Sequence, residues 1–111
     1  RDNWYETRDL TLDTRYTTTR SAALLAARAR QAFLEYNPLP ISPEDPERIY
    51  RTVATGPLVE VFALDLRSYR GANSENRQPQ LNDASRIMGA RQVDWLKARL
   101  EASRSTWKVI A

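Results

Sequence analysis

The sequence contains no cysteine and no histidine among its 111 residues. Without cysteine, the chain cannot form disulfide bonds, provide a thiolate nucleophile or build a cysteine-ligated zinc site. Without histidine, a Ser-His-Asp triad and acid–base catalysis by imidazole are excluded as well. These exclusions are the firmest statement about function that the composition makes.

Long apolar runs and a large excess of one charge are also absent. No apolar stretch approaches the roughly 20 residues that a membrane-spanning helix needs, so we expect no membrane contact. The 15 arginines and 2 lysines stand against 14 acidic residues, for a net charge of +3. Because the basic residues are scattered along the chain, they indicate a solvated surface rather than a nucleic-acid footprint. The apolar share is 41% and the charged share 28%. Such a composition is typical of one soluble globular domain.

The first part of the sequence changes from loop-like to helical character. Residues 1–19 are polar, rich in threonine and tyrosine, and show no sustained period, which is typical of a loop. In the run 20–36, alanine, leucine and arginine dominate and apolar residues recur at helical spacing. We expect Thr18 or Thr19 to cap this helix. Four prolines in residues 37–46 must end it.

Two strands and a long loop are predicted next. Residues 47–67 are typical of two strands about a turn at 55–57, with the first strand a half-exposed edge. The run 58–66 is more continuously apolar, which indicates a strand covered on both faces, as in a layered α/β sheet. Residues 67–85 hold glycine, asparagine, serine and proline with almost no apolar residue. They predict a surface loop of a length that is usually functional or disordered.

The last part predicts a helix followed by a strand. Val93, Leu96 and Leu100 fall on one helical face, and residues 107–111 form an apolar strand. A helix and a strand beside an apolar strand imply an α/β fold, with about two helices and three strands in all. Because the last strand stops with the chain and the first residues belong to a polar motif, we expect residues 1–111 to be a single partial domain.

Three charged residues close the central apolar run, namely Asp65, Arg67 and Arg70. Ligands gather at the carboxyl ends of strands in open α/β sheets, so these side chains could face an anionic substrate or a metal. They could instead pair with one another and with the loop backbone, which fixes the exit from the strand. Arginine's planar fork suits such bracing, and the pattern favours this second interpretation. Asn3 could offer an amide oxygen to a hard cation. From composition alone, however, an asparagine at this position is more typical of a turn or a cap.

Two other functions stay open at this point. Trp4, Trp95 and Trp107, with arginines between them, would suit a module that binds nucleic acid. Core packing explains Trp95 and Trp107 better, because they lie in a patterned helix and a strand, while Trp4 is undecided. The strand at 107–111, if unpaired, would be a template for association. A non-catalytic interaction module that self-associates through cut sheet edges is therefore the other alternative.

Several segments together resemble a known family. The segments EVFALDLRSYRG and IMGARQVDWLKARLEASRSTWKVIA contain Asp65-Leu66-Arg67 with Arg70, Met88-Gly89 with Gln92, Trp95-Leu96, and the residues Ser103 to Ile110. They are similar to the D-x-R-x-x-R strand, the L-G-x-x-Q-x-x-W-L helix and the S-x-x-T-W-K-V-I segment of the alkaline phosphatase D (PhoD-like) metallophosphatases. LLAARARQAFLEYNPLP and DPERIYRT also look like that family. The resemblance covers essentially the whole chain.

The resemblance implies a metal-dependent phosphoester hydrolase with a four-layer α/β sandwich of the metallophosphatase type, located outside the cytoplasm. In that family RDNW follows a DDHE motif and its asparagine binds metal, so the resemblance makes Asn3 a metal ligand. An amide oxygen suits calcium or another hard ion better than zinc, and the family adds iron. Asp65, Arg67 and Arg70 match the strand-end motif and are expected to support the site from beside it. A phosphoester is the expected partner, without nucleic acid or membrane.

The family's other metal ligands include aspartates, a cysteine, a tyrosine and histidines, in segments before Arg1 and after Ala111. One asparagine cannot hold a multinuclear centre. We therefore expect a fragment that contains no catalytic residue, holds no metal stably and has no phosphatase activity by itself.

Overall fold

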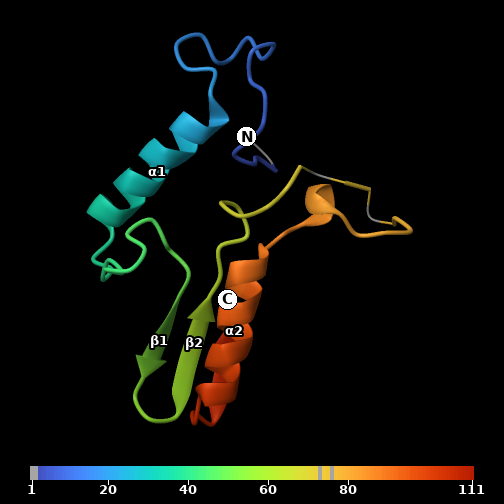
Figure 1. Cartoon of the computed structure of the whole chain (residues 1–111). Helices are drawn as coiled ribbons and strands as arrows, with labels where there is room; N and C mark the ends of the chain where they lie inside the picture. The colour runs from blue at the N-terminus through green and yellow to red at the C-terminus, as the bar shows by residue number, and fades with distance from the viewer. Residues whose placement is uncertain (1–2, 73, 76) are drawn as a thin grey trace.

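A computed structural model describes residues 3–72, 74–75 and 77–111 of the chain. Its elements are α1 (Ala22–Tyr36), β1 (Arg51–Thr55), β2 (Val59–Ala63), the short 3-10 helix η1 (Asp83–Ser85), α2 (Ala90–Ala102) and β3 (Trp107–Ile110). The expected α/β class is confirmed, with two α-helices and three strands in the described part of the chain (Figure 1).

The strands form one mixed sheet in the order β1-β2-β3. β1 and β2 pair antiparallel around a turn that contains Gly56 at φ 65°, and β1 is an edge strand as expected. β3 pairs parallel with β2, with Val61 opposite Val109. Because parallel neighbours need a crossover connection, the chain passes through residues 64–89 and α2 before it returns as β3. This crossover brings the end of β2 and the start of α2 together at the same end of the sheet.

The core beside the sheet is small and aromatic. Phe62 of β2 is completely buried, and Tyr50, just before β1, is 6% exposed. The Tyr50 ring makes edge contacts with Tyr69, at 5.5 Å between ring centroids, and with Trp95 of α2, at 4.8 Å. The predicted packing role of Trp95 is therefore confirmed. α2 lies along β2 in Figure 1, and the Tyr50 ring links α2 to the residues before β1 and after β2.

A second apolar cluster lies between α1 and the N-terminal segment, which Figure 1 shows apart from the sheet. Leu10 is 2% exposed, and Ala22 and Ala26 of α1 are 7% exposed each. The expected threonine cap of this helix is wrong, because the Ser21 hydroxyl accepts the N–H of Leu24 at 3.2 Å instead. The helix therefore starts later than a threonine cap would place it.

One arginine of α1 ties this part of the chain together. The Arg30 guanidinium is 2.7 Å from a carboxylate oxygen of Glu6 and 2.9 Å from one of Glu47. The Arg30 side chain is only 13% exposed. The contact with Glu6, whose side chain is 37% exposed, is therefore partly shielded from water, whereas Glu47 is 74% exposed. The N-terminal segment, α1 and the residue that follows the proline-rich stretch 37–46 are thereby joined.

The face of the sheet opposite Phe62 is open. Val53, Val109 and Trp107 share that face by the strand register and are 46%, 45% and 67% exposed. Two expectations are therefore wrong for the described residues, because β2 is covered on one face only and Trp107 is not a core residue. A continuous apolar run shows which surface is suited to burial, but the covering element must come from elsewhere.

The described chain is also extended for its mass. Its accessible surface is 8501 Å², against about 6,300 Å² for a compact protein of this size. The Cα radius of gyration is 16.5 Å, where a compact domain would have about 13 Å. The chain therefore leaves much apolar surface uncovered. Within the described ranges, no helix is long and apolar enough to cross a membrane.

Candidate functional site

The site starts at Asp65, which follows β2 and is 5% exposed. Its Oδ1 accepts hydrogen bonds from the backbone N–H groups of Arg67 and Ser68, both at 2.9 Å. These two bonds turn the chain sharply out of the strand, as aspartate does in an Asx turn. Oδ2 is buried as well and has no hydrogen-bond partner among the described residues. Asp65 thus fixes the strand exit through backbone amides.

Gln92, in the first turns of α2, holds the backbone of Asp65 from the other side. Its Oε1 accepts the Asp65 N–H at 2.8 Å, and its Nε2 donates to the Asp65 carbonyl at 2.8 Å. The same nitrogen donates to the Met88 carbonyl at 3.0 Å. Gln92 is 1% exposed. Its amide groups are therefore satisfied inside the protein, as buried polar groups usually are. The side-chain amide thus pairs with the backbone of Asp65 as a neighbouring strand would.

The start of α2 is fitted closely against the same turn. Gly89, the N-cap of α2, has φ 76° and ψ 148°. This conformation favours glycine, because a positive φ costs other residues free energy. A Cβ there would lie 3.1 Å from the Cβ of Tyr69. Burial first, and then the charges of Asp45, Tyr50 and Asp65, raise the pKa of Tyr69 to about 12. The Tyr69 phenol is therefore neutral near pH 7 and is not suited to be a general base.

The strand-end motif meets Asn3 across 64 residues of sequence. The Arg67 Nη1 donates to the Asn3 Oδ1 at 3.2 Å. Asn3 has φ 50°. This is the left-handed region, which asparagine tolerates better than most residues. Because Asp65 fixes the backbone of Arg67 and Arg67 contacts the Asn3 amide, these three predicted residues form one connected group. The first two residues of the RDNW motif lie outside the described residues.

Arg70, the fourth predicted residue, lies on a hollow that Asn3 also lines. This hollow has a volume of about 440 Å³, and Arg86 lines it too. We call it the arginine pocket, defined by Asn3, Arg70 and Arg86. The two arginines also line an adjoining cavity of about 400 Å³ at the start of α2. The structure therefore gathers all four predicted residues on one side of the molecule.

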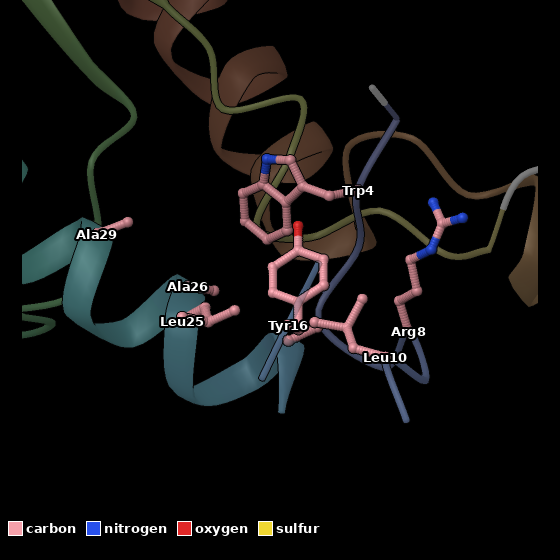
Figure 2. A pocket seen from close by; sticks show the side chains of 8 residues that line it. Trp4, Arg8, Leu10, Tyr16, Leu25, Ala26 and Ala29 are labelled. Atoms are coloured by element: carbon pink, nitrogen blue, oxygen red, sulfur yellow. The ribbon is translucent and has the colours of Figure 1, made fainter. Parts of the chain in front are cut away.

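A separate apolar hollow of about 210 Å³ lies between the N-terminal segment and α1. Figure 2 shows Trp4 and Tyr16 over the surface formed by Leu25 and Ala26 of α1, with Leu10 beside them. This lining is almost entirely apolar. The undecided Trp4 is half-buried and lines this apolar hollow together with residues of α1.

The described residues do not provide a complete metal centre. Among them, no group of three or more Asp, Glu, Cys or His side chains lies together as metal ligands would. Asn3 offers one amide oxygen, and that oxygen already accepts a bond from Arg67. A calcium ion takes six to eight oxygen ligands, so this donor set does not fit a metal without further ligands.

A comparison with protein-family models gives a match to the PhoD-like phosphatase model over residues 1–111. The chain belongs to the PhoD-like phosphatase family. No curated protein and no solved structure matches it. Membership confirms the resemblance seen in the sequence and implies a metallophosphatase-type fold, with which the two helices and the mixed sheet agree. It also supports a hydrolase of the phosphatase class.

In this PhoD-like chain, sequence reasoning missed the roles of two residues. Gln92 lies four and eight positions before Leu96 and Leu100, in line with the apolar stripe of the helix. A polar residue at such a position indicates a buried hydrogen-bonding role, so a signal was present. Arg86 gave no signal, because its position depends on how the long loop closes.

Proposed function

We propose that these 111 residues form one wall of the active site of a metal-dependent phosphoester hydrolase of the PhoD-like type. The contact between Arg67 and Asn3 carries this proposal. It joins Arg67 of the strand-end segment to Asn3 of the RDNW segment, and both segments resemble motifs of the PhoD-like family, whose model matches residues 1–111. A fold that served only to pack a core would not need to bring these polar side chains together at the surface.

Within this proposal, Asn3 is a metal ligand through its amide oxygen, and calcium is the hard ion that such an oxygen suits. Iron is the second metal that we propose for the parent enzyme. Arg67 orients the Asn3 amide by donating to Oδ1, and this oxygen has a second lone pair that a metal could use. Asp65 supports both residues by fixing the turn, and Arg70 adds positive charge beside them. These metals would serve to activate water and offset charge on phosphate.

We further propose that the isolated chain is inactive. Only one of the proposed ligands, Asn3, is present, and the described residues offer no other cluster to complete a metal site. The whole sequence also lacks the cysteine and histidine side chains that strong metal sites use.

Hydrolysis of p-nitrophenyl phosphate tests both statements. The isolated chain, with calcium or iron added, should give no rate above the metal ions alone. The natural full-length polypeptide that contains these residues should hydrolyse the ester under the same conditions. Full activity of the isolated chain would overturn the inactivity, and an inactive full-length protein with metals bound would overturn the phosphoesterase assignment.

One observation supports a second function, a non-catalytic interaction module. The open sheet face around Val53, Trp107 and Val109 is apolar. Exposed apolar faces of this kind mark interaction surfaces. Sedimentation over a range of concentrations separates this alternative from the first. Concentration-dependent association of the chain would support it, and a strict monomer would count against it.

A further inference from the structure

Arg70 and Arg86 are brought together by one backbone contact at the base of the long loop. The N–H of Gly71 donates to the carbonyl oxygen of Arg86 at 2.8 Å, which closes the loop between them. The approach is so close that a Cβ on residue 71 would overlap the carbonyl oxygen of Asp83. The juxtaposition of the two arginines thus depends on a position that only glycine can occupy.

The loop that carries Arg86 is ordered locally by its own side chains. Asn82 and Ser85 form a reciprocal capping box around η1, in which the Asn82 side chain accepts the Ala84 N–H at 3.0 Å. The Ser85 hydroxyl accepts the Asn82 N–H at 2.8 Å. Arg86 follows directly, so its backbone is set by η1 on one side and by Gly71 on the other. Its position is therefore a built feature of the loop.

Two arginines are among the described residues that line the arginine pocket, together with Asn3 and one glutamate, Glu75. The Arg86 guanidinium is 3.8 Å from the Asp83 carboxylate, a loose ion pair with a fully exposed partner. The Arg86 side chain is 49% exposed. Because exposed ion pairs contribute little, its donors can move onto a ligand at little cost in free energy. The Glu6 carboxylate, which lines the adjoining cavity, is already paired with Arg30 at 2.7 Å.

We infer that the arginine pocket binds an oxyanion group of the substrate other than the reacting phosphoryl group. Guanidinium groups bind phosphate and carboxylate oxygens through two parallel hydrogen bonds, and Arg70 and Arg86 both line this pocket. Its volume is about 440 Å³. This size falls in the range of small-molecule sites and exceeds what one phosphate needs. Asn3, which we place at the reacting end, lines the same pocket. The substrate class is a phosphoester whose alcohol part carries a second oxyanion, such as a second phosphate.

This inference rests on the proposed function for the identity of the natural ligand, whereas anion binding can be measured without any metal or catalysis. The probes are inorganic phosphate, with one phosphoryl group, and pyrophosphate, with two. The isotope-labelled 111-residue chain is titrated by NMR in buffer that contains a chelator. Ionic strength is held constant, because surface charge effects depend on salt. The backbone resonances of Gly71 and Arg86 report on the pocket.

We expect saturable shifts with pyrophosphate and weaker binding of inorganic phosphate. Arg86→Gln should weaken pyrophosphate binding by about tenfold or more, the usual effect of removing one charge-assisted contact, and should affect inorganic phosphate less. Arg104→Gln is the matched control, since Arg104 is an exposed arginine beyond the far end of α2. It should leave both affinities within about twofold, the size of surface effects.

Gly71→Ala provides a second variant that keeps both arginines. It should separate them and weaken pyrophosphate binding to the level of Arg86→Gln. The absence of saturable shifts, equal losses in Arg86→Gln and Arg104→Gln, or unchanged binding in both pocket variants would overturn the inference. A full-length protein that lacks phosphatase activity would overturn the proposed function alone, because these titrations involve no turnover.

Discussion

The side-chain amide of Gln92 pairs with the backbone N–H and C=O of Asp65, both at 2.8 Å, as a neighbouring strand would. This pairing attaches the start of α2 to the end of β2. Asp65 in turn fixes the backbone of Arg67, which contacts Asn3. Gln92 therefore helps to place the strand-end motif, although the described hydrogen bonds of its side chain go to Asp65 and Met88 and not to Asn3.

Gln92→Leu should lower the free energy of unfolding by about 3 kcal/mol, because it leaves the buried N–H and C=O of Asp65 without partners. Urea denaturation followed by circular dichroism measures this loss. Lys97, at an exposed position of the same helix, provides the control. Lys97→Leu should change stability by less than about 0.5 kcal/mol. Equal effects of the two substitutions would show that the pairing does not stabilise the fold.

Asp65→Ala should release the N–H groups of Arg67 and Ser68, and amide hydrogen exchange at both should accelerate strongly. Asp65→Asn keeps a side-chain oxygen in the same place and should retain most of the protection, because the two bonds need only an acceptor. Hydrogen exchange followed by NMR compares the two variants. If Asp65→Ala leaves both amides protected, the turn is held by other contacts.

Two glycines with positive φ allow a matched comparison of backbone strain and crowding. An added Cβ at Gly56 meets no atom within 4 Å. Gly56→Ala should therefore cost only the left-handed conformation, about 1–2 kcal/mol. Gly89→Ala meets the Cβ of Tyr69 as well, so it should destabilise the chain more. Thermal or urea unfolding of the two variants measures the difference. A smaller loss at Gly89 would contradict the close fit of α2 against the turn.

Tyr69 predicts a loss of stability at high pH. Burial raises the pKa of Tyr69 to about 12 in the folded chain, from an ordinary value of 10.0. The unfolded chain therefore loses this proton first, so the contribution of Tyr69 is fully present below about pH 10 and is lost as the pH rises towards about 12. Tyr69→Phe should show a shallower decline than the wild type across this pH window. Identical declines would show that Tyr69 is not shielded.

The elements were largely predictable from the sequence, because helical spacing in 20–36 and strand-like runs in 58–66 are local signals. The four residues of the proposed site also stand out in the sequence, although for Asn3 the resemblance was needed, since a lone asparagine has many uses. The cap at Ser21 was missed because several neighbouring hydroxyl residues compete for that role. The exposure of Trp107 was missed because a sequence pattern cannot show whether another element covers a sheet face.

The arginine pocket was not predictable for a different reason. Arg70 and Arg86 come together only through the contact of Gly71 with the loop end, and no periodicity encodes that closure. The adjacency of Arg67 and Asn3 likewise joins positions 64 residues apart. Long-range polar contacts of this kind depend on the final packing of the chain.

The central claim is that Asn3 is part of a phosphoesterase site, and substitution of Asn3 in the natural full-length polypeptide tests it most directly. Asn37→Ala, at the end of α1, is the matched control and should change kcat/KM for p-nitrophenyl phosphate by less than about threefold. Asn3→Ala should lower kcat/KM by about a hundredfold or more and should also lower the bound metal content. Loss of a metal ligand should cost more than loss of a residue that only orients the ligand. Wild-type activity and metal content in Asn3→Ala would contradict the account.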